Sequence, residues 1–465
     1  MKVILLYPKT GFDIPGVSID LPLSILHVAS AITDVSEVVL IDQRVEPDWE
    51  DKLMCELSNA NILGISSMTC PQITHGIEAA KIARRMSPRT KIVWGGAHPT
   101  LFPDQVLDSG YADHVVVGRG EERFREMLGY PPAPTKELPY HLLRAGMEKY
   151  IGGQGRFDKD TRALIIVTAS GCPYKCAYCA SSLFPRTSES VTHVIDRVCR
   201  LVDQFGINAI AFHDEEFLIN TNRSLAIAKG ITERLGGRSS GFRWWCQTRM
   251  DSLERLGPQG LEILWESGLE AFQPGIESGS ERILKMIDKR ETVEQFIRIN
   301  LLLAQYEFSP LYNFIVGFPT ETIDEMKETL NLAVTLLDNN PRAQVAGVYI
   351  LVPYPGTEMF DASVAAGFIP PKKLEDWANF SRQHTLTPWL VGDVKKFVEF
   401  ASITSRFVDG KRLAKRLQLV RPTPYWNEDA LLGLAQCVQK QWVQGDISNV
   451  ALYKSVNSLI LGNYQ

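Results

Sequence analysis

Short, nearly continuous apolar runs alternate with segments of helical periodicity over the first 130 residues of the chain. Such runs are typical of strands that are buried on both faces. The expected strands are residues 3–8, 37–42, 62–68, 91–96 and 114–118, and the expected helices are 21–33, 48–60, 74–86 and 101–110. Strict alternation of strand and helix predicts a doubly wound parallel sheet with right-handed crossovers. Ligands bind such sheets at the carboxyl ends of the strands.

The same alternation restarts at Arg162. The strands expected there are 163–170, 209–217, 243–251, 269–278, 311–319 and 345–355, with helices at 194–206, 222–236, 258–268 and 323–338. About six strand–helix units favour a partial (β/α)6 barrel over a complete eight-stranded one. Chemistry in barrels of this kind is expected at the carboxyl ends of the strands.

The regions between and after these patterns define the remaining boundaries. Four prolines between Gly129 and His141 predict a linker. Beyond residue 360 the pattern becomes that of amphipathic helices, as in 397–417. We therefore predict an α/β domain over 1–130, a linker over 131–161, a partial barrel over 162–360 and a small helical domain over 361–465. Aromatic and histidine side chains of the last domain are more typical of core than of ligands: Trp377, His384, Trp389, Trp426 and Trp442.

Composition narrows the class of protein. With 45% hydrophobic and 22% charged residues, the chain is typical of soluble globular proteins. Its net charge of −5 argues mildly against a nucleic-acid partner. No run approaches the ~20 apolar residues of a membrane span. The residues after Met1 do not form a signal peptide, so we expect a cytoplasmic protein.

Three of the 8 cysteines fall within one short stretch, as CxxxCxxC at Cys172, Cys176 and Cys179. Chance would produce such a pattern roughly twice in a thousand chains of this composition. In a reducing cytosol, clustered cysteines bind metal or react more often than they pair. The stretch follows the first strand of the predicted barrel, which places it at the reactive rim. The scattered remainder are expected to be small buried hydrophobes: Cys55, Cys70, Cys199, Cys246 and Cys437.

Three thiolates on one loop can hold three irons of a cubane cluster and leave the fourth iron open, whereas four cysteines saturate it. A structural zinc site needs a fourth ligand of ordinary spacing. The candidates, His193 and Cys199, come well after Cys179, and Cys199 falls in a predicted helix. An iron–sulfur cluster is favoured, and zinc stays the alternative.

With Tyr178 at the aromatic position, the loop resembles the CxxxCxΦC motif of the radical SAM family. The resemblance implies that the open iron of a [4Fe-4S] cluster chelates the amino and carboxylate groups of S-adenosylmethionine. It also implies reductive cleavage to a 5′-deoxyadenosyl radical. An external electron donor of the flavodoxin or ferredoxin type is then expected.

Later strand ends resemble further steps of that family. In the acidic stretch 212–217, Glu215 and Glu216 stand where other members bind the ammonium of S-adenosylmethionine, and a solvated helix cap is the alternative. Arg249 is a candidate partner for the methionine carboxylate, because its fork of donors suits a carboxylate. A surface ion pair is the alternative for Arg249.

Three more steps follow in order along the chain. In 275–284, the resemblance assigns Glu277 and Ser278 to the ribose hydroxyls. Residues 314–322 resemble a GFPGET step, with Thr320 in place of the usual glycine, and 353–357 resemble the last-strand step. Imperfect matches in the right order at strand ends are jointly stronger than any one alone.

The strand ends of the first domain lack the motifs of three familiar ligand sites. The chain has neither GxGxxG after its first strand nor GxxxxGK[ST], and Ser66-Ser67-Met68-Thr69 stands where a phosphoacceptor Asp would be. Glycines follow the later strands, at Gly95-Gly96 and at Gly118-x-Gly120-Glu121. Paired glycines without a phosphate motif let a bulky ligand lie close to the backbone.

This arrangement resembles the cobalamin-binding domain, which is of Rossmann type. The resemblance assigns cobalamin contacts to Ser66, Met68, Thr69, Gly95, Gly96, Gly118, Gly120 and Glu121. The usual DxHxxG, whose His ligates cobalt, is replaced by DQRVEP at 42–47. We therefore expect either a cobalt without a protein lower ligand or a domain that has lost cobalamin. A purely structural flavodoxin-like domain remains the alternative.

The order of the domains resembles the cobalamin-dependent radical SAM enzymes of natural-product and cofactor pathways. Their majority chemistry is methylation of an unactivated carbon or a phosphinate, which implies a small-molecule substrate and makes a C-methyltransferase the favoured function. A radical cyclase, ring-contracting or heteroatom-exchange enzyme on the same scaffold is the first alternative. A non-enzymatic iron–sulfur or zinc-binding module is the second. No side chain can be assigned as catalytic from the sequence.

Overall fold

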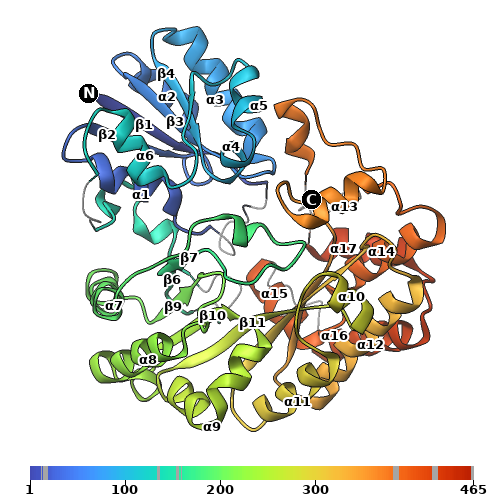
Figure 1. Ribbon diagram of the computed structural model, residues 1–465. Helices are drawn as coiled ribbons and strands as arrows, with labels where there is room; N and C mark the ends of the chain where they lie inside the picture. The colour runs from blue at the N-terminus through green and yellow to red at the C-terminus, as the bar shows by residue number, and fades with distance from the viewer. Residues whose placement is uncertain are drawn as a thin grey trace. The chain divides into compact units, whose positions relative to one another are not determined.

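The computed structural model describes residues 1–11, 13, 19–132, 137–152, 157–158, 160–380, 387–420 and 428–461. The chain divides into two compact units. The first consists mainly of residues 1–151 together with 369–384, and the second mainly of 152–368 together with 385–464. Figure 1 shows a sheet with helices around it in each unit.

The first unit is built on a five-stranded parallel sheet in the order β2-β1-β3-β4-β5. The strands are β1 (Lys2–Tyr7), β2 (Glu37–Asp42), β3 (Ile62–Ser66), β4 (Lys91–Gly95) and β5 (His114–Val115). Its main helices are α1 (Leu23–Ile32), α2 (Trp49–Leu57), α3 (Gln72–Met86), α4 (Ala97–Leu101), α5 (Pro103–Asp108) and α6 (Gly120–Met127). Residues Val3 to Leu6 of the interior strand β1 are buried on both faces. The predicted doubly wound fold is confirmed.

Two local details differ from the expected pattern. The helix expected at 101–110 is the shorter α5, and α4 before it was not expected. The two helices meet at Phe102, because Pro103 has no N–H with which to continue α4 and instead begins α5. The helix α6 was not predicted, since it is strongly polar and only eight residues long.

Segments from outside residues 1–130 complete the first unit. Residues 137–151 contain the short 3₁₀ turns η1 (Tyr140–Leu142) and η2 (Met147–Lys149), and Tyr150 is buried. A second segment contains η5 (Leu374–Asn379), whose Trp377 lies 4.7 Å from Phe102 between ring centroids. The Trp377 indole N–H donates to Gln105 at 2.6 Å. Part of the expected linker and part of the expected C-terminal domain thus pack with the first sheet.

The second unit has a six-stranded parallel sheet in the order β13-β12-β11-β10-β9-β6. These strands are β6 (Ala163–Ile166), β9 (Ala209–Phe212), β10 (Arg243–Thr248), β11 (Leu269–Glu277), β12 (Ser309–Val316) and β13 (Gln344–Ile350). The helices between them are α7 (Val191–Phe205), α8 (Thr221–Leu235), α9 (Met250–Glu266), α10 (Glu281–Met286), α11 (Val293–Leu303) and α12 (Ile323–Asn339). Six strands in sequential order confirm the partial barrel.

Local chemistry explains how these helices begin and bend. The side chain of Thr322 accepts from the backbone N–H of Glu325, and the Glu325 carboxylate accepts in return, which forms a capping box at the start of α12. Helix α9 is kinked at Gly257, which has φ 64° and precedes Pro258. The helix expected at 258–268 is therefore only the part of α9 that follows the kink, and α9 as a whole begins earlier, at Met250.

The C-terminal part of the second unit is helical. It contains α13 (Glu358–Ala365), α14 (Gly392–Thr404), α15 (Gly410–Val420), α16 (Glu428–Gln444) and α17 (Val450–Leu461). Helix α14 packs against β13, and α16 packs against α12. The buried Trp442 donates to the Thr404 hydroxyl at 2.8 Å. His384, Trp426 and one of the four prolines of the expected linker, Pro134, lie outside the described part of the chain.

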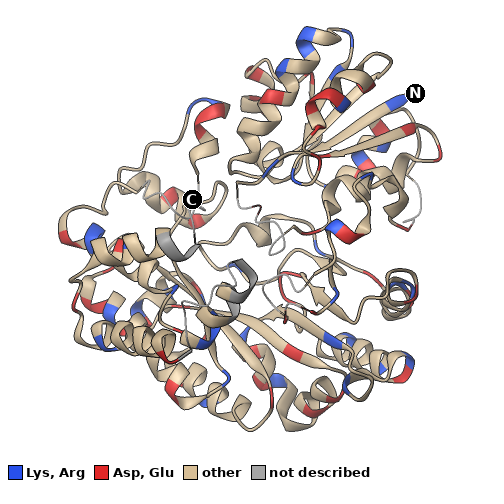
Figure 2. Cartoon of the chain, turned by 180° about the vertical axis from the view of Figure 1, so that it is seen from behind, with Lys and Arg blue, Asp and Glu red and all other residues tan. Residues whose placement is uncertain are grey.

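Charged residues of both signs are interspersed along the helices, as Figure 2 shows. Within the described residues, no helix has both the length and the apolar character that crossing a membrane requires.

Candidate active site

The cysteine loop, residues 171–180, follows β6 at the carboxyl end of its strand. Its base is closed by a short antiparallel pair, β7 (Ala169–Ser170) with β8 (Thr187–Ser188). Gly171 has φ 74°, and a Cβ there would lie 2.7 Å from the carbonyl oxygen of Phe184. Only glycine fits that turn. Cys172, Cys176 and Cys179 are partly exposed on this loop, and none forms a disulfide.

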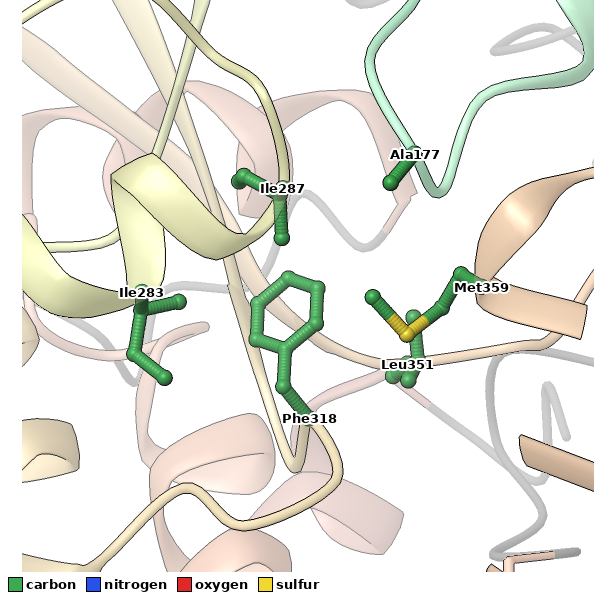
Figure 3. Close-up of a cluster of buried hydrophobic side chains, with 6 residues drawn as sticks. All are labelled: Ala177, Ile283, Ile287, Phe318, Leu351 and Met359. Carbon is green, nitrogen blue, oxygen red and sulfur yellow. The ribbon is translucent and has the colours of Figure 1, made fainter. Parts of the chain in front are cut away.

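The centre of the loop is fixed by backbone hydrogen bonds on both sides. The N–H of Ala177 donates to the carbonyl of Ile287 at 2.9 Å, and the N–H of Met359 donates to the carbonyl of Ala177 at 2.8 Å. Figure 3 shows the Ala177 side chain pointing into a buried apolar cluster with Phe318 at its centre. The remaining members of that cluster are Ile283, Ile287, Leu351 and Met359. The loop therefore has a fixed seat at the ends of β11, β12 and β13.

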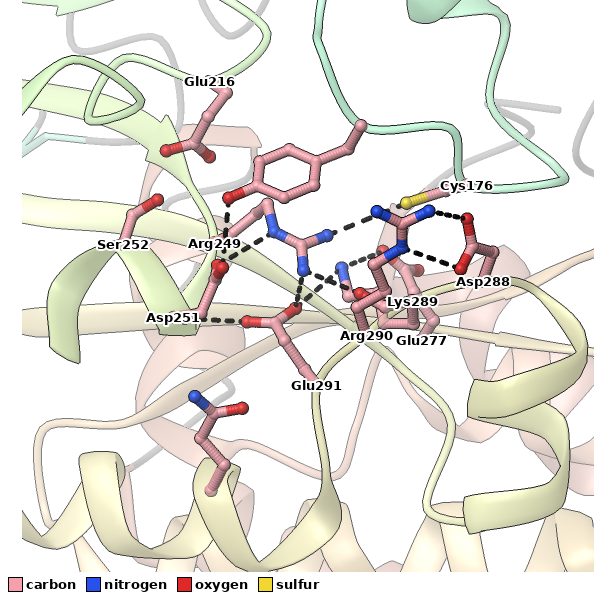
Figure 4. Close-up of polar contacts among 12 residues, drawn as sticks. Cys176, Glu216, Arg249, Asp251, Ser252, Glu277, Asp288, Lys289, Arg290 and Glu291 are labelled. Atoms are coloured by element: carbon pink, nitrogen blue, oxygen red, sulfur yellow. Dashed lines mark hydrogen bonds and ion pairs between the residues drawn. The ribbon is translucent and has the colours of Figure 1, made fainter. Parts of the chain in front are cut away.

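Arg249, which follows β10, lies under the loop (Figure 4). One terminal N–H of its guanidinium donates to the Sγ of Cys176 at 3.7 Å. The guanidinium carbon lies 3.9 Å from the ring centroid of Tyr174, and Nε donates to Asp251 at 2.9 Å. The Tyr174 hydroxyl donates to the same carboxylate at 3.0 Å. Two residues of the loop are thus held by one arginine–aspartate pair.

Further charges continue this arrangement below the loop (Figure 4). Glu291 pairs with Arg249 at 3.2 Å and with Lys289 at 3.4 Å. Lys289 lies 3.6 Å from Glu277, which accepts from the Tyr178 hydroxyl at 2.8 Å. We call Arg249, Asp251, Glu277, Lys289 and Glu291 the charge network. Alternate loop residues, at positions 174, 176 and 178, all contact it.

Backbone strain is concentrated beside this network. Glu277, Asp288 and Arg290 have φ of 67°, 50° and 58°, in the region that side-chain-bearing residues rarely adopt. Glu277 also lies at a register shift between β11 and β12. Strain of this kind persists where surrounding contacts over-determine the backbone, and it is common at functional sites.

The three thiols are close enough to influence one another. Burial is the largest of the causes that raise the pKa of Cys172 to about 11, and the charges of Glu216, Cys179 and Cys176 also raise it. Burial also raises the pKa of Cys176, while Lys289 and Arg249 oppose that rise. A metal takes up cysteine as thiolate and releases the protons. Among the described residues, no group of three His, Cys, Asp or Glu side chains stands as a preformed metal site.

The acidic step after β9 divides into buried and accessible carboxyl groups. Asp214 is buried and accepts from the N–H and the hydroxyl of Thr168, both at 2.6 Å. Glu216 is buried as well and accepts from the hydroxyl of Thr248 at 3.0 Å. Burial raises the pKa of Glu216 to about 8. Glu215 is half-buried, so it is the more accessible member of the predicted ammonium pair.

The other residues predicted to bind S-adenosylmethionine are already engaged within the protein. Arg249 and Glu277 belong to the charge network. Ser278 is fully buried, and its hydroxyl lies 3.1 Å from that of Thr329 and accepts from the N–H of Ser280 at 3.1 Å. Their proposed contacts with S-adenosylmethionine stay predictions.

Sequence reasoning missed Lys289 and Glu291. They lie in the run DKRET between α10 and α11, which has the composition of a solvated surface loop. Both are nonetheless buried. Only the fold, which brings this loop beneath the cysteines, distinguishes them.

In the first unit, the loops after β3 and β4 are tied together. Ser67 donates its N–H to the carbonyl of Gly95 at 2.9 Å, and the Thr69 hydroxyl lies 3.0 Å from Nδ1 of His98. Gly96 has φ 100°, and a Cβ there would lie 2.7 Å from the carbonyl of Ser67. Met68 is 45% exposed beside these loops. The Ser66 hydroxyl lies 2.8 Å from that of Ser24.

The two glycines after β5 have different surroundings, since an added Cβ at Gly120 would lie 3.0 Å from Val28. Gly118 has φ 82° and no atom within 4 Å of an added Cβ, and its N–H donates to the Thr100 hydroxyl at 3.0 Å. Gly120 begins α6, and Glu121 pairs with Arg119 at 2.6 Å. The predicted cobalamin positions of β3, β4 and β5 thus all lie at the carboxyl edge of one sheet.

Arg44 occupies the position that the His of DxHxxG would take. It forms two hydrogen bonds with Asp42, at 2.9 and 2.7 Å, and donates to the carbonyl of Asp20 at 2.7 Å. Its guanidinium carbon lies 4.2 Å from the ring centroid of Tyr7. The Tyr150 hydroxyl donates to Asp42 at 3.0 Å. An arginine that is always charged has no lone pair for cobalt.

Comparison with known proteins agrees with this geometry. The family model of the Radical SAM superfamily matches residues 166–333, and that of the B12 binding domain matches residues 16–128. The chain belongs to the radical SAM enzymes that carry a B12-binding domain. The cofactors that these two domains imply are a [4Fe-4S] cluster, S-adenosylmethionine and cobalamin.

Several relatives share most of the chain. It is 28% identical to an uncharacterized methyltransferase of Pyrococcus horikoshii, over 78% of this chain and 83% of the relative. It is 23% identical to the cytidylyl-2-hydroxyethylphosphonate methyltransferase of Streptomyces wedmorensis, over 79% and 77%. It is 25% identical to the anaerobic magnesium-protoporphyrin IX monomethyl ester cyclase of Rubrivivax gelatinosus, over 70% of this chain and 62% of the cyclase.

Two solved structures share the fold. The radical S-adenosylmethionine methyltransferase TsrM from Kitasatospora setae, with cobalamin and a [4Fe-4S] cluster bound, superposes with a TM-score of 0.62 at 15% identity, covering 98% of this chain and 99% of TsrM. The cobalamin-dependent radical enzyme OxsB superposes with a TM-score of 0.72 at 16% identity, covering 100% of this chain and 77% of OxsB.

Proposed function

We propose that this protein is a cobalamin-dependent radical SAM methyltransferase that methylates an unactivated carbon, or a phosphinate, of a small molecule. The observation that carries the proposal is the seating of the cysteine loop over the charge network at the rim of a partial barrel, in a chain that also has a B12-binding domain. Relatives that align with more than three quarters of this chain include two methyltransferases, one of Pyrococcus horikoshii and one of Streptomyces wedmorensis.

The cysteine loop supplies the metal site. Its three thiols suit three irons of a four-iron cluster, and the fourth iron is left for S-adenosylmethionine. When bound and reduced by an external flavodoxin- or ferredoxin-type donor, the cluster supplies the electron that cleaves S-adenosylmethionine. The chain holds the loop rigid through Ala177 and keeps water from its lower side with the apolar cluster around Phe318.

Among the predicted contacts for the ammonium group, the structure favours Glu215. Its carboxyl group is half-buried, whereas that of Glu216 is buried and bonded to Thr248. A carboxyl whose pKa is about 8 is largely protonated at neutral pH and pairs poorly with an ammonium. Glu216 instead supports the end of β10 from within the barrel.

The first unit provides the cobalamin site. Gly118 gives backbone that a large planar ligand can approach, Gly96 lets the loops after β3 and β4 come together, and Met68 offers an exposed apolar contact. Arg44 closes the position of the usual ligating His with a paired guanidinium. This position would therefore offer a bound cobalt no nitrogen ligand.

A second candidate function is radical cyclisation without net methyl transfer. The identity of 25% to the cyclase of Rubrivivax gelatinosus, over 70% of this chain, supports it. Both functions use the same cluster loop and the same sheet edge, so the difference lies in what becomes of the methyl group.

The deciding experiment follows that methyl group. Anaerobically reconstituted protein is incubated with cobalamin, a reductant and S-adenosylmethionine carrying ¹³C in its methyl group, first without substrate and then with small-molecule candidates such as alkylphosphinates. Methyl transfer predicts label in the extracted corrinoid, with release of S-adenosylhomocysteine, and then label in the product. Release of 5′-deoxyadenosine with the label recovered only in methionine and in unreacted S-adenosylmethionine would favour cyclisation instead.

A further inference from the structure

We propose that Arg249 is a positioning residue that sets the reduction potential of the cluster, acting through its N–H bond to the Cys176 sulfur, and that Glu291 limits the positive charge which Arg249 delivers there. The proposal rests on the proposed function in one respect, namely that the three thiols hold an iron–sulfur cluster.

The guanidinium is fixed on every side. Nε donates to Asp251 at 2.9 Å, and one terminal nitrogen donates to the carbonyl of Lys289 at 2.6 Å and pairs with Glu291 at 3.2 Å. The flat face stacks on Tyr174. The other terminal nitrogen faces the Sγ of Cys176 at 3.7 Å. Because Nε and one terminal nitrogen are engaged with Asp251, Lys289 and Glu291, the other terminal nitrogen is held facing the sulfur.

The surroundings of Arg249 are buried and nearly neutral. Arg249, Lys289 and Glu291 expose only 6%, 3% and 4% of their surface. The acids that face this region are Asp251, Glu277 and Glu291, and the bases are Arg249, Lys289 and Arg255, which pairs with Asp251 at 2.7 Å. Removing one base or one acid therefore leaves a net charge of either sign in a poorly solvated place.

A net positive charge and a net negative charge should shift the reduction potential of the cluster in opposite directions. Hydrogen bonds to the sulfurs and nearby charge are among the factors that set the potential of an iron–sulfur cluster. A positive charge and an N–H donor stabilise the reduced form, which carries the extra electron. Losing Arg249 should therefore make the potential more negative, and losing the charge of Glu291 should make it more positive.

The test compares Arg249→Gln and Glu291→Gln in the full chain after anaerobic reconstitution. In Glu291→Gln, the amide oxygen can still accept the hydrogen bond that the backbone N–H of Asp251 donates to Glu291 at 2.8 Å. Arg290→Gln is the matched control, since Arg290 lies in the same loop but is exposed and paired with Asp288. Iron and sulfide content is measured first, and the midpoint potential is then measured by redox titration followed by paramagnetic resonance.

We expect about a tenfold change in the reduction equilibrium for each variant, ~59 mV for a one-electron couple, negative for Arg249→Gln and positive for Glu291→Gln. The control should shift far less, because water screens its charge. If Arg249→Gln does not hold the cluster, Arg249→Lys replaces it in the comparison with Glu291→Gln. Lysine keeps the positive charge but lacks the forked donors of the guanidinium, so a smaller negative shift of the potential is expected.

Two results would overturn the proposal. One is an intact cluster whose potential is unchanged in the variants, and the other is a shift in the same direction for the acid and the base variants, as a merely structural disturbance would give. Stoichiometric zinc without sulfide in the unmodified protein would overturn the proposed function itself. The failures of the two proposals are therefore distinguishable.

Discussion

Two arginines with buried side chains, one in each unit, have closely similar partners. They differ in what the remaining donors of the guanidinium face. Arg44 follows β2 and Arg249 follows β10. Each stacks on a tyrosine, at 4.2 and 3.9 Å, and each donates to a backbone carbonyl, at 2.7 and 2.6 Å. Each also pairs with an aspartate two residues away. Only Arg249 keeps a donor directed at a cysteine sulfur.

The difference shows that a buried ion pair does not by itself indicate a cofactor contact. The guanidinium of Arg44 forms two bonds with Asp42 and fills the place of a metal ligand, so it contributes the shape of the first unit. The guanidinium of Arg249 divides its donors among several acceptors and turns one toward Cys176. The direction of the last donor distinguishes a structural pair from one that can act on a metal site.

The largest effect is expected from the thiols themselves. Cys172→Ala, Cys176→Ala or Cys179→Ala should each abolish the cluster, because three ligands on one loop have no replacement nearby. Iron, sulfide and the visible spectrum measure the loss. Cys199→Ala, in the buried face of α7, is the control and should keep the full cluster. A single-alanine variant with undiminished iron and sulfide would show that the loop is not the ligand set.

A large loss of stability is expected from Arg44→Met. The substitution leaves the carboxylate of Asp42 buried without its cation, which typically costs about 3–5 kcal/mol. Urea unfolding of the full chain measures it. Arg84→Met is the matched control, since Arg84 pairs with Asp113 near the surface and should lose only about 0–1 kcal/mol. Equal losses for both variants would mean that the Arg44 pair stabilises the fold no more than a surface pair does. The reduction potential of the cluster should not change in either variant.

A change in stability that depends on pH is expected at Glu216. Its folded pKa of about 8 lies above the ordinary value of 4.5 because of burial. The folded state thus binds the proton more tightly, and this contribution to stability is full below pH 4.5 and lost as pH rises through 8. The slope is up to about 1.4 kcal/mol per pH unit.

Glu216→Gln should remove that loss, so its unfolding free energy relative to the unmodified protein should improve between about pH 5 and 8. The exposed Glu233 of α8 provides the control Glu233→Gln, whose curve should run parallel to that of the unmodified protein. Parallel curves for Glu216→Gln as well would mean that the carboxyl is ionised in the folded state.

The smallest spectroscopic effect is expected at cobalt. With Arg44 in place of the usual His, the Co(II) form should show no three-line nitrogen splitting in its paramagnetic resonance spectrum. Added imidazole serves as the positive control for a nitrogen ligand. A three-line pattern in the protein alone would contradict the absence of a protein lower ligand, and failure to bind cobalamin would favour chemistry without it.

The strands, the position of the cysteine loop and the lack of a cobalt-ligating His could be predicted, because each depends on local spacing or periodicity. The partners of Arg249 could not, because Lys289 and Glu291 sit in a charged run that looks solvated until α10 and α11 place it beneath the loop. The packing of Trp377 with the first sheet also escaped prediction, since periodicity records which face is apolar and not which distant surface covers it.

The most direct test of the central claim is the metal and sulfide content of the protein purified and reconstituted without oxygen. If the three thiols hold a cluster with one open iron, the chain should contain about four irons and about four sulfides, and its reduced signal should change when S-adenosylmethionine is added. Stoichiometric zinc without labile sulfide, or a cluster whose signal is indifferent to S-adenosylmethionine, would contradict the account.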